Sequence, residues 1–243
     1  MVPFGFRQPF SGALSPGEVV TISGTAIGPN DTATGAVDSA TNRWMTTVGG
    51  VQVTFNGIAG PVLYSSATQV SAVVPYEVAG RLDCFVVVRY RGNGSNAVDL
   101  PVTSSAPGVY TQNLSGTGPG VIYNQDGTLN SPGNPAAKNS VIVIYGTGEG
   151  LGRNLSGASP QTGQVIPIGN VADDPRPILP VAVQIDGQPS SLYANFFGSV
   201  PGTIAGVWQT NVIVPPTAGS GNVPVVVSVG SNSSQTGVTV AIR

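Results

Sequence analysis

The chain has 243 residues, a net charge of −2 and only 8% charged residues, too few to build long helices with Lys and Glu faces. Its 34 Gly and 21 Pro residues alternate with runs rich in Val and Ile, which favours many short strands separated by turns. The absence of histidine excludes Ser-His and Cys-His catalytic pairs and imidazole-ligated metals.

Strand-like runs recur from the N-terminus onward, and no segment has the i, i+3, i+4, i+7 spacing of an amphipathic helix, so the class is all-β. The first runs are residues 18–24, 51–57, 61–64, 70–75, 84–90 and 98–103. The dipeptides Asn56-Gly57 and Asn93-Gly94 predict type I′ hairpin turns, because both central positions of that turn need a positive φ. Cys84, the single cysteine, is expected to be a small buried hydrophobe.

The second half of the chain repeats the first in the same order. The matched segments are residues 20–28 with 142–150, 51–64 with 181–193, 68–75 with 208–215, and 85–98 with 225–238. In this alignment Asp186-Gly187 answers Asn56-Gly57. The repeat predicts two tandem immunoglobulin-like β-sandwich domains, residues 1–104 and 105–243, the second with additional N-terminal strands and long loops.

Two segments rich in turn residues lie outside the repeat. Residues 104–139 are expected to add strands to the second domain, with a hairpin tip at Asp126-Gly127, and residues 152–180 are expected to wrap the same domain. The strand pattern also predicts a set of buried core residues: Val53, Val73, Val87, Ile144, Val183, Ile213 and Val226.

Five phrases in order resemble one family: SGALSPGEVVTISGTAIGP (residues 11–29), GGVQVTFNGIAGPVLYSSATQVSAVVP (49–75), APGVY (106–110), NQDGTLNSPGNPAAKNSVIVIYGTGEG (124–150) and WQTNVIVPPTAGSGNVPVVVSVG (208–230). The chain is similar to the uncharacterised C-terminal domain of secreted Solibacter-type acidobacterial proteins, which is related to tandem IPT/TIG immunoglobulin-like modules. This resemblance implies an extracellular pair of β-sandwiches that follows some other domain. It implies no catalytic residues.

Catalytic and cofactor motifs are weak. GTGEGLG (residues 146–152) has Leu151 where a dinucleotide fingerprint needs its third glycine, and turn glycines with positive φ are the expected explanation. The glutamates Glu18, Glu77 and Glu149 are dispersed, unlike the paired acids of a glycosidase. We therefore expect no enzyme activity, no catalytic residue, no cofactor and no metal site.

Two minor possibilities concern loop carboxylates and the single lysine. Loop oxygens could bind Ca²⁺, but solvated turn residues are the expected role of the four loop aspartates, Asp31, Asp38, Asp173 and Asp174. Lys138 precedes a strand, where an isopeptide with an asparagine is conceivable and a charged strand entry is far commoner.

The charge pattern and the N-terminus bear on partners and location. Arg81, Arg89 and Arg91 are interrupted by Asp83 and predict a solvated strand face, so nucleic acid is not expected as a partner. The first twenty residues show no signal peptide, and no run approaches the ~18 apolar residues of a membrane helix. Together with the resemblance, this abrupt start suggests a fragment of a longer exported chain, extracellular or at the cell surface.

The primary functional hypothesis is a non-catalytic structural or interaction module for adhesion, anchoring or assembly. Partners would be proteins or further copies, bound through edge strands or an apolar loop at residues 194–207. The alternative for this loop, and the more expected one, is that it closes the end of its own sandwich. The candidate interaction residues are Phe196, Phe197, Trp208 and Trp44. A carbohydrate-binding module that stacks sugars on aromatic rings is the first alternative, and a carboxylate-based hydrolase is the second.

Overall fold

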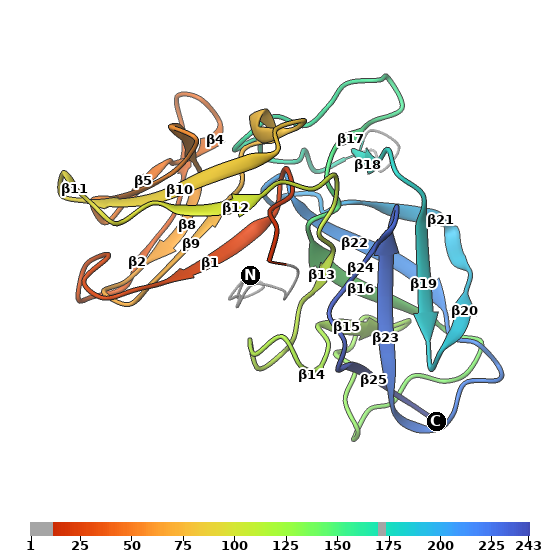
Figure 1. The fold of residues 1–243 in the computed structure, drawn as a ribbon. Coiled ribbons are helices and arrows are strands. Elements are labelled where there is room, and N and C mark those ends of the chain that lie inside the picture. The colour runs from red at the N-terminus through yellow and green to blue at the C-terminus, as the bar shows by residue number, and fades with distance from the viewer. Residues whose placement is uncertain (1–11, 170–173) are drawn as a thin grey trace.

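In the computed structural model, which describes residues 12–169 and 174–243, the chain is almost entirely β-structure. Figure 1 shows two lobes, one formed by the early strands and the other by the late strands. Each lobe contains two main sheets, and the chain forms two tandem immunoglobulin-like β-sandwiches, as predicted. We call the lobe of β1–β12 the first sandwich and that of β13–β25 the second sandwich. A domain boundary between residues 104 and 105 stays a prediction.

The first sandwich has a four-stranded sheet in the order β1-β9-β8-β2 and a six-stranded sheet in the order β11-β10-β6-β5, with β12 beside β10 and β7 beside β6. A short ribbon, β3 with β4, and one 3-10 turn, η1, complete it. The elements are β1 (Val19–Ser23), β2 (Ala33–Thr34), β3 (Val37–Asp38), β4 (Arg43–Trp44), β5 (Thr47–Val48), β6 (Val51–Phe55), β7 (Ile58–Gly60), β8 (Val62–Ser65), β9 (Gln69–Val73), η1 (Tyr76–Val78), β10 (Asp83–Tyr90), β11 (Asn93–Gly94) and β12 (Val98–Pro101).

The second sandwich has a five-stranded sheet in the order β13-β16-β22-β21, with β15 beside β16, and a six-stranded sheet in the order β14-β25-β23-β19-β20, with β24 beside β23. β17 and β18 form a separate two-stranded sheet, and the Ser199 N–H of β21 donates to the Pro175 carbonyl beside it. The strands are β13 (Gly108–Val109), β14 (Gly118–Pro119), β15 (Ile122–Asn124), β16 (Val141–Thr147), β17 (Gly152–Arg153), β18 (Arg176–Pro177), β19 (Val181–Ile185), β20 (Gln188–Ser190), β21 (Leu192–Ser199), β22 (Val207–Ile213), β23 (Gly221–Val229), β24 (Asn232–Ser233) and β25 (Val238–Ile242).

The predicted equivalent turns are confirmed. Asn56 and Gly57 have φ values of 51° and 81° between β6 and β7, and Asp186 and Gly187 have 55° and 69° between β19 and β20. Both positive values fit a type I′ turn. The turn predicted at Asn93-Gly94 was wrong. Arg91 and Gly92, with φ values of 49° and 85°, make the turn, and Asn93 and Gly94 form β11.

The predicted core is right at four positions and one residue out of register at three. Val53, Val73, Ile144 and Val183 are buried, as is Cys84. Val87, Ile213 and Val226 are only half-buried, and their neighbours face the core instead: Val86, Val88, Val212, Val214, Val225 and Val227. These positions lie in continuous runs of β-branched residues, where no polar alternation marks the inner face and a shift of one residue exchanges the faces.

An apolar cluster joins the two sandwiches. It contains Val19, Leu63 and Val73 of the first and Tyr110, Ile204 and Val207 of the second. At its edge the Val19 N–H donates to Thr147 Oγ1 at 2.8 Å, and the Thr147 hydroxyl donates to the Gly206 carbonyl at 2.6 Å. A Cβ on Gly206 would lie 1.9 Å from the Gly17 carbonyl oxygen. The backbone segments of the two sandwiches therefore approach so closely here that only glycine fits at position 206.

The long connection after β17, which was expected to wrap the second sandwich, also reaches the first. The Tyr76 N–H donates to Thr162 Oγ1 at 2.9 Å, and the Thr162 hydroxyl donates to Glu77 Oε2 at 2.6 Å. The Trp44 N–H donates to the Gly163 carbonyl at 2.8 Å. Polar turn residues in this segment satisfy backbone groups of the neighbouring sandwich, and the connection therefore braces the two sandwiches together.

Candidate functional site: the open side of the first sandwich

Three of the four predicted interaction residues are buried. Phe196, Phe197 and Trp208 are 5%, 3% and 0% exposed. The first part of the expected apolar loop belongs to β21, and residues 200–206 connect β21 to β22. The Phe197 ring lies 4.7 Å from the Trp208 ring, centroid to centroid. The Arg176 guanidinium lies 5.7 Å from the centre of the Phe196 ring. The burial of these rings favours the alternative that the segment closes the end of its own sandwich over an accessible interaction surface.

Trp44, the fourth predicted residue, is half-buried in β4 and packs against the apolar cluster between the sandwiches. It lines a shallow hollow of about 440 Å³ together with Asp38, Thr41, Arg43 and Pro61. Within the described residues, the structure does not bring Trp44 together with the other three predicted rings.

The glycine-rich segment and two of the glutamates have structural roles. Gly148, with a φ of 80°, would place a Cβ 1.9 Å from the Ala106 carbonyl oxygen, so the glycine serves a close backbone contact, as the turn interpretation predicted. Glu18 is fully buried, and its Oε2 accepts the Ser15 N–H at 2.8 Å. Glu149 is 4% exposed. Neither carboxyl meets solvent, so they do not form an accessible catalytic pair.

The buried carboxyls share one polar region between the sandwiches. Burial raises the pKa of Tyr110 well above its usual value, and the Glu149 and Glu18 charges raise it further. Burial likewise raises the pKa of Glu149 to about 8. Glu149 Oε2 has no hydrogen-bond partner within the described part of the chain. Burial therefore favours the protonated, neutral form of the Glu149 carboxyl.

One of the positions considered for calcium or an isopeptide differs from expectation. Asp174 is 3% exposed, so the expectation that it is a solvated turn residue was wrong. Within residues 12–169 and 174–243, no group of three or more Asp, Glu or Cys side chains could hold a metal ion. Asp38 accepts the Ala40 N–H at 2.9 Å, which is the behaviour of a turn aspartate. Asp173 lies outside the described residues. Lys138 is half-buried in the turn that precedes β16.

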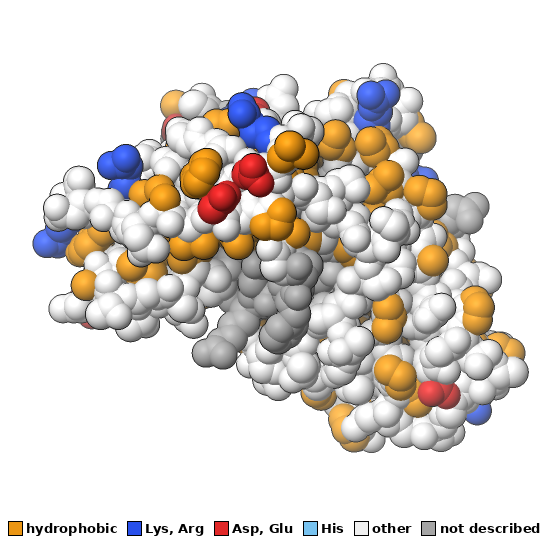
Figure 2. Space-filling view, in the orientation of Figure 1, with side chains coloured by type: hydrophobic (Ala, Val, Ile, Leu, Met, Phe, Trp, Pro, Cys, Tyr) orange, Lys and Arg blue, Asp and Glu red, His pale blue; other side chains and the backbone are white. Residues whose placement is uncertain are grey.

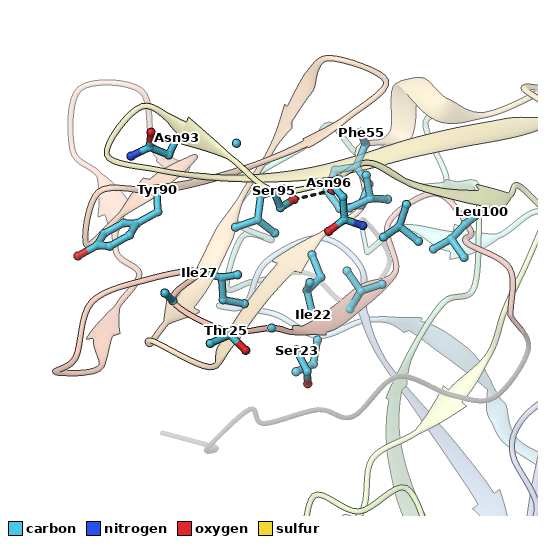
Figure 3. A pocket seen from close by; sticks show the side chains of 18 of the residues that line it. Ile22, Ser23, Thr25, Ile27, Phe55, Tyr90, Asn93, Ser95, Asn96 and Leu100 are labelled. Carbon is cyan, nitrogen blue, oxygen red and sulfur yellow. Dashed lines mark hydrogen bonds between the residues drawn. The ribbon is translucent and has the colours of Figure 1, made fainter.

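A groove of about 500 Å³ opens between the two sheets of the first sandwich, along the edge formed by β1 on one side and β11 and β12 on the other. Its floor and walls are apolar and include Val20, Ile22, Val88, Val98 and Leu100. Figure 3 shows Ile22, Ile27 and Leu100 between the ribbons of the two sheets. Polar side chains at the groove are uncharged: Thr21, Ser23, Thr25, Asn93, Ser95 and Asn96.

Tyr90 and Ser95 shape the far end of this groove. The Arg91 guanidinium lies 5.2 Å from the centre of the Tyr90 ring. The Val88 N–H donates to Ser95 Oγ at 3.1 Å, and the Ser95 hydroxyl donates to the Asn96 carbonyl at 2.7 Å (Figure 3). The groove was not predicted, because the residues that line it read as ordinary strand residues. One signal was available. The sequence predicted extra strands before residue 142 in the second repeat and none at the matching place beside residues 20–28 in the first.

The surface is poor in charge, as the composition predicts. Figure 2 shows few charged side chains on the face in view, with hydrophobic side chains scattered between them. Arg81, Arg89 and Arg91 are exposed, as expected of a solvated face. Among the described residues, no helix is long and apolar enough to cross a membrane.

Residues 8–102 match the family model of the IPT/TIG domain, a non-enzymatic immunoglobulin-like domain type, which supports a relation of this segment to IPT/TIG modules. The matched segment includes β1 through β12, and therefore both walls of the groove. No curated protein matches the sequence.

Several solved structures are similar over most of the chain, at low identity. The SGBP-B protein of a mixed-linkage glucan utilization locus of Bacteroides ovatus, solved with a mixed-linkage heptasaccharide, is 15% identical with a TM-score of 0.35, covering 98% of this chain and 46% of that one. An SGBP-B from a xyloglucan utilization locus of Bacteroides uniformis is 10% identical with a TM-score of 0.27, covering 98% and 49%. The extracellular region of Plexin A4 is 12% identical with a TM-score of 0.26, covering 93% and 18%. The chain spans less than half the length of each, and similarity at this level identifies no ligand.

Proposed function

We propose that the chain is a non-catalytic binding module of an exported bacterial protein, acting outside the cell or at its surface. The observation that carries the proposal is the groove between β1 and β12, which leaves apolar side chains of the first sandwich uncovered. Apolar clefts with a few polar groups at the rim are the usual form of a binding site. The relation of residues 8–102 to IPT/TIG modules and the resemblance to the acidobacterial family support the extracellular assignment.

The interaction mode differs from the one expected from sequence. Phe196, Phe197 and Trp208 stabilise the second sandwich and are not offered to a partner. Binding is assigned instead to the open side of the first sandwich, where Val98 is 47% exposed. Edge strands were the other expected mode of association, and β1 is an edge strand.

The test exposes the intact chain to a displayed random-peptide library and to a glycan array. We expect ligands whose binding is lost in Val98→Asp, which puts a charge into the groove. Binding should be kept in Leu82→Asp, which replaces an apolar side chain that is 83% exposed and does not line the groove. Ligands that bind both variants equally would contradict the assignment of the groove. Turnover of an ester or glycoside that is lost on replacing one carboxylate would contradict the non-catalytic assignment.

A second candidate function is glycan binding at Trp44. An indole ring beside Asp38, Thr41 and Arg43 combines a stacking surface with polar groups, which is the chemistry that sugars need. Glycan-array signals that disappear in Trp44→Ala and survive in Val98→Asp would favour this hollow over the groove.

A further inference from the structure

The two sandwiches can be compared residue by residue through their sheet registers. Val20 of β1 faces Ala72 of β9, and Ile142 of β16 faces Val212 of β22, which are the pairs that the sequence repeat aligns. β16 is therefore the counterpart of β1, and Ile144 the counterpart of Ile22. Any element that pairs with the outer edge of β16 shows what the same edge of β1 can accept.

The outer edge of β16 is covered, whereas that of β1 is not. β13 and β15 both pair antiparallel with β16, with Val109 opposite Gly146 and Ile122 opposite Ile144. Among the described residues, β1 pairs with β9 alone and ends its sheet. The first sandwich thus lacks, in this part of the chain, the strands that close the second.

The backbone groups of β1 that would meet such a strand can be identified. The Gly24 N–H donates to the Thr68 carbonyl at 3.0 Å, and the Glu18 carbonyl accepts the Val74 N–H at 2.8 Å. Because antiparallel bonding alternates along a strand, Thr21 and Ser23 point their backbone groups to the outer edge. Val143 is the counterpart of Thr21 and lies opposite Tyr123 of β15. Tyr145, the counterpart of Ser23, donates its N–H to the Val121 carbonyl at 3.3 Å and accepts the Tyr110 N–H at 3.0 Å.

The side chains behind this edge show the same difference. Cys84 of β10 faces Leu100 of β12, and Val223 of β23 faces Val240 of β25, so Leu100 and Val240 are counterparts. Val240 is 1% exposed and Leu100 is half-buried. Two residues earlier, Val238 is fully buried and Val98 is 47% exposed. Ile122 is 0% exposed and lies opposite Ile144. It therefore fills, in the second sandwich, the position that corresponds to the groove of the first.

We propose that the groove accepts an extended, uncharged segment of another polypeptide, added antiparallel to β1, with a β-branched or aliphatic side chain seated beside Val98 and Ile22. This inference rests on the proposed binding function and names its ligand. Main-chain hydrogen bonds to Thr21 and Ser23 would supply affinity, and the apolar groove would select the inserted side chain. No charged side chain lines the groove among the described residues, so a charged insert would find no counter-ion there.

The probe is a labelled peptide with the sequence of residues 118–125, GPGVIYNQ, which includes the strand beside β16. Its fluorescence anisotropy is titrated with the intact chain, and the control is the same peptide with Ile122→Asp. We expect saturable binding of the first peptide and at least a tenfold weaker binding of the control. Equal binding of the two peptides, or binding of neither, would overturn the proposal.

Two variants of the chain locate the site. Val98→Asp should weaken binding at least tenfold, and Leu82→Asp should leave it unchanged. Ser23→Pro removes an outer-edge N–H at an exposed position of an edge strand and should also weaken binding. Melting curves report whether each variant is folded. Peptide binding that survives both Val98→Asp and Ser23→Pro in folded protein would overturn the proposal.

Further outcomes distinguish a strand of another polypeptide from two other occupants of the groove, a second copy of the chain and a glycan. A concentration-dependent dimer in sedimentation that Val98→Asp abolishes would assign the groove to a second copy of the chain. It would overturn the proposal that a different polypeptide binds there. If no peptide binds while a glycan binds in a Val98-dependent manner, the strand inference fails and the binding function stands. If neither class of ligand depends on Val98, both fail.

Discussion

Val98 and Val238 occupy the same register position in the two sandwiches, yet Val98 is 47% exposed and Val238 is fully buried. The difference does not arise from the side chain, which is the same. It arises because β13, β14 and β15 cover this side of the second sandwich, and the described residues of the first sandwich place no strand on the corresponding side. Among the residues that the structure describes, this side is therefore closed in the second sandwich and open in the first.

The corrected strand register predicts different costs at neighbouring valines. Val88 is 4% exposed and Val87 is half-buried on the opposite face of β10. Val88→Asp should lower the free energy of unfolding by at least about 3 kcal/mol, because the carboxylate would be buried without a partner. Val87→Asp should cost about 1 kcal/mol. Urea denaturation measures both, and a larger cost at Val87 would show that the register is out by one residue.

Close backbone contact between the sandwiches makes Gly206 sensitive. Gly206→Ala would put a Cβ 1.9 Å from the Gly17 carbonyl oxygen, whereas Gly157, also at positive φ, has nothing within 4 Å of its Cβ position. We expect Gly206→Ala to destabilise the chain by about 2–4 kcal/mol more than Gly157→Ala. Equal melting temperatures for the two variants would contradict the contact.

Glu149 predicts a pH dependence of stability. Its pKa is raised from 4.5 to about 8 in the folded chain, so the folded state holds a proton that the unfolded state releases above pH 4.5. The stabilisation is therefore complete below about pH 4.5 and is lost as the pH rises toward 8. Tyr76 and Tyr110 share this region, but their raised pKa values keep them neutral throughout.

The matched variant for this effect is Glu149→Gln, which keeps the shape and cannot ionise. Denaturation curves from pH 5 to pH 8 should show wild-type stability falling with pH and the variant remaining nearly constant. Wild-type and variant stabilities that change with pH in the same way across this window would exclude Glu149 as the titrating group.

The aromatic pair in the second sandwich predicts a stability effect without a binding effect. Phe197 is 3% exposed and lies against Trp208, so Phe197→Ala should cost about 3–5 kcal/mol. Phe85, which is 52% exposed on β10, supplies the control, and Phe85→Ala should cost less than about 1 kcal/mol. Calorimetry compares the two variants. An unchanged melting temperature of Phe197→Ala would contradict the burial of this ring.

Repetition and turn chemistry made the architecture predictable. Asn56-Gly57 and Asp186-Gly187 marked equivalent hairpins because only a few residue types adopt two successive positive φ values. The sequence could not predict which face of its strand Val87 or Val226 occupies, because a run of valines shows no alternation of apolar and polar residues. The burial of Phe196 and Phe197 and the convergence of Glu18 and Glu149 depend on contacts between distant segments, which local patterns do not encode.

The groove could not be predicted either, because it is defined by the lack of a neighbouring strand among the described residues. Nothing in Val20, Ile22 or Val98 distinguishes an uncovered strand from a covered one. Only the comparison with Ile142, Ile144 and Val238 in the second sandwich shows that the same residues elsewhere receive a strand.

Amide hydrogen exchange at Thr21 and Ser23, with Tyr145 as the internal reference, tests the central claim most directly. The account predicts fast exchange at Thr21 and Ser23 and slow exchange at Tyr145 in the free chain, because only Tyr145 donates its N–H to a strand at the outer edge. On saturation with the peptide of residues 118–125, exchange at Thr21 and Ser23 should slow at least tenfold while Tyr145 stays unchanged. Protection of Thr21 and Ser23 equal to that of Tyr145 in the free chain, or no added protection with peptide, would contradict an open groove that binds a strand.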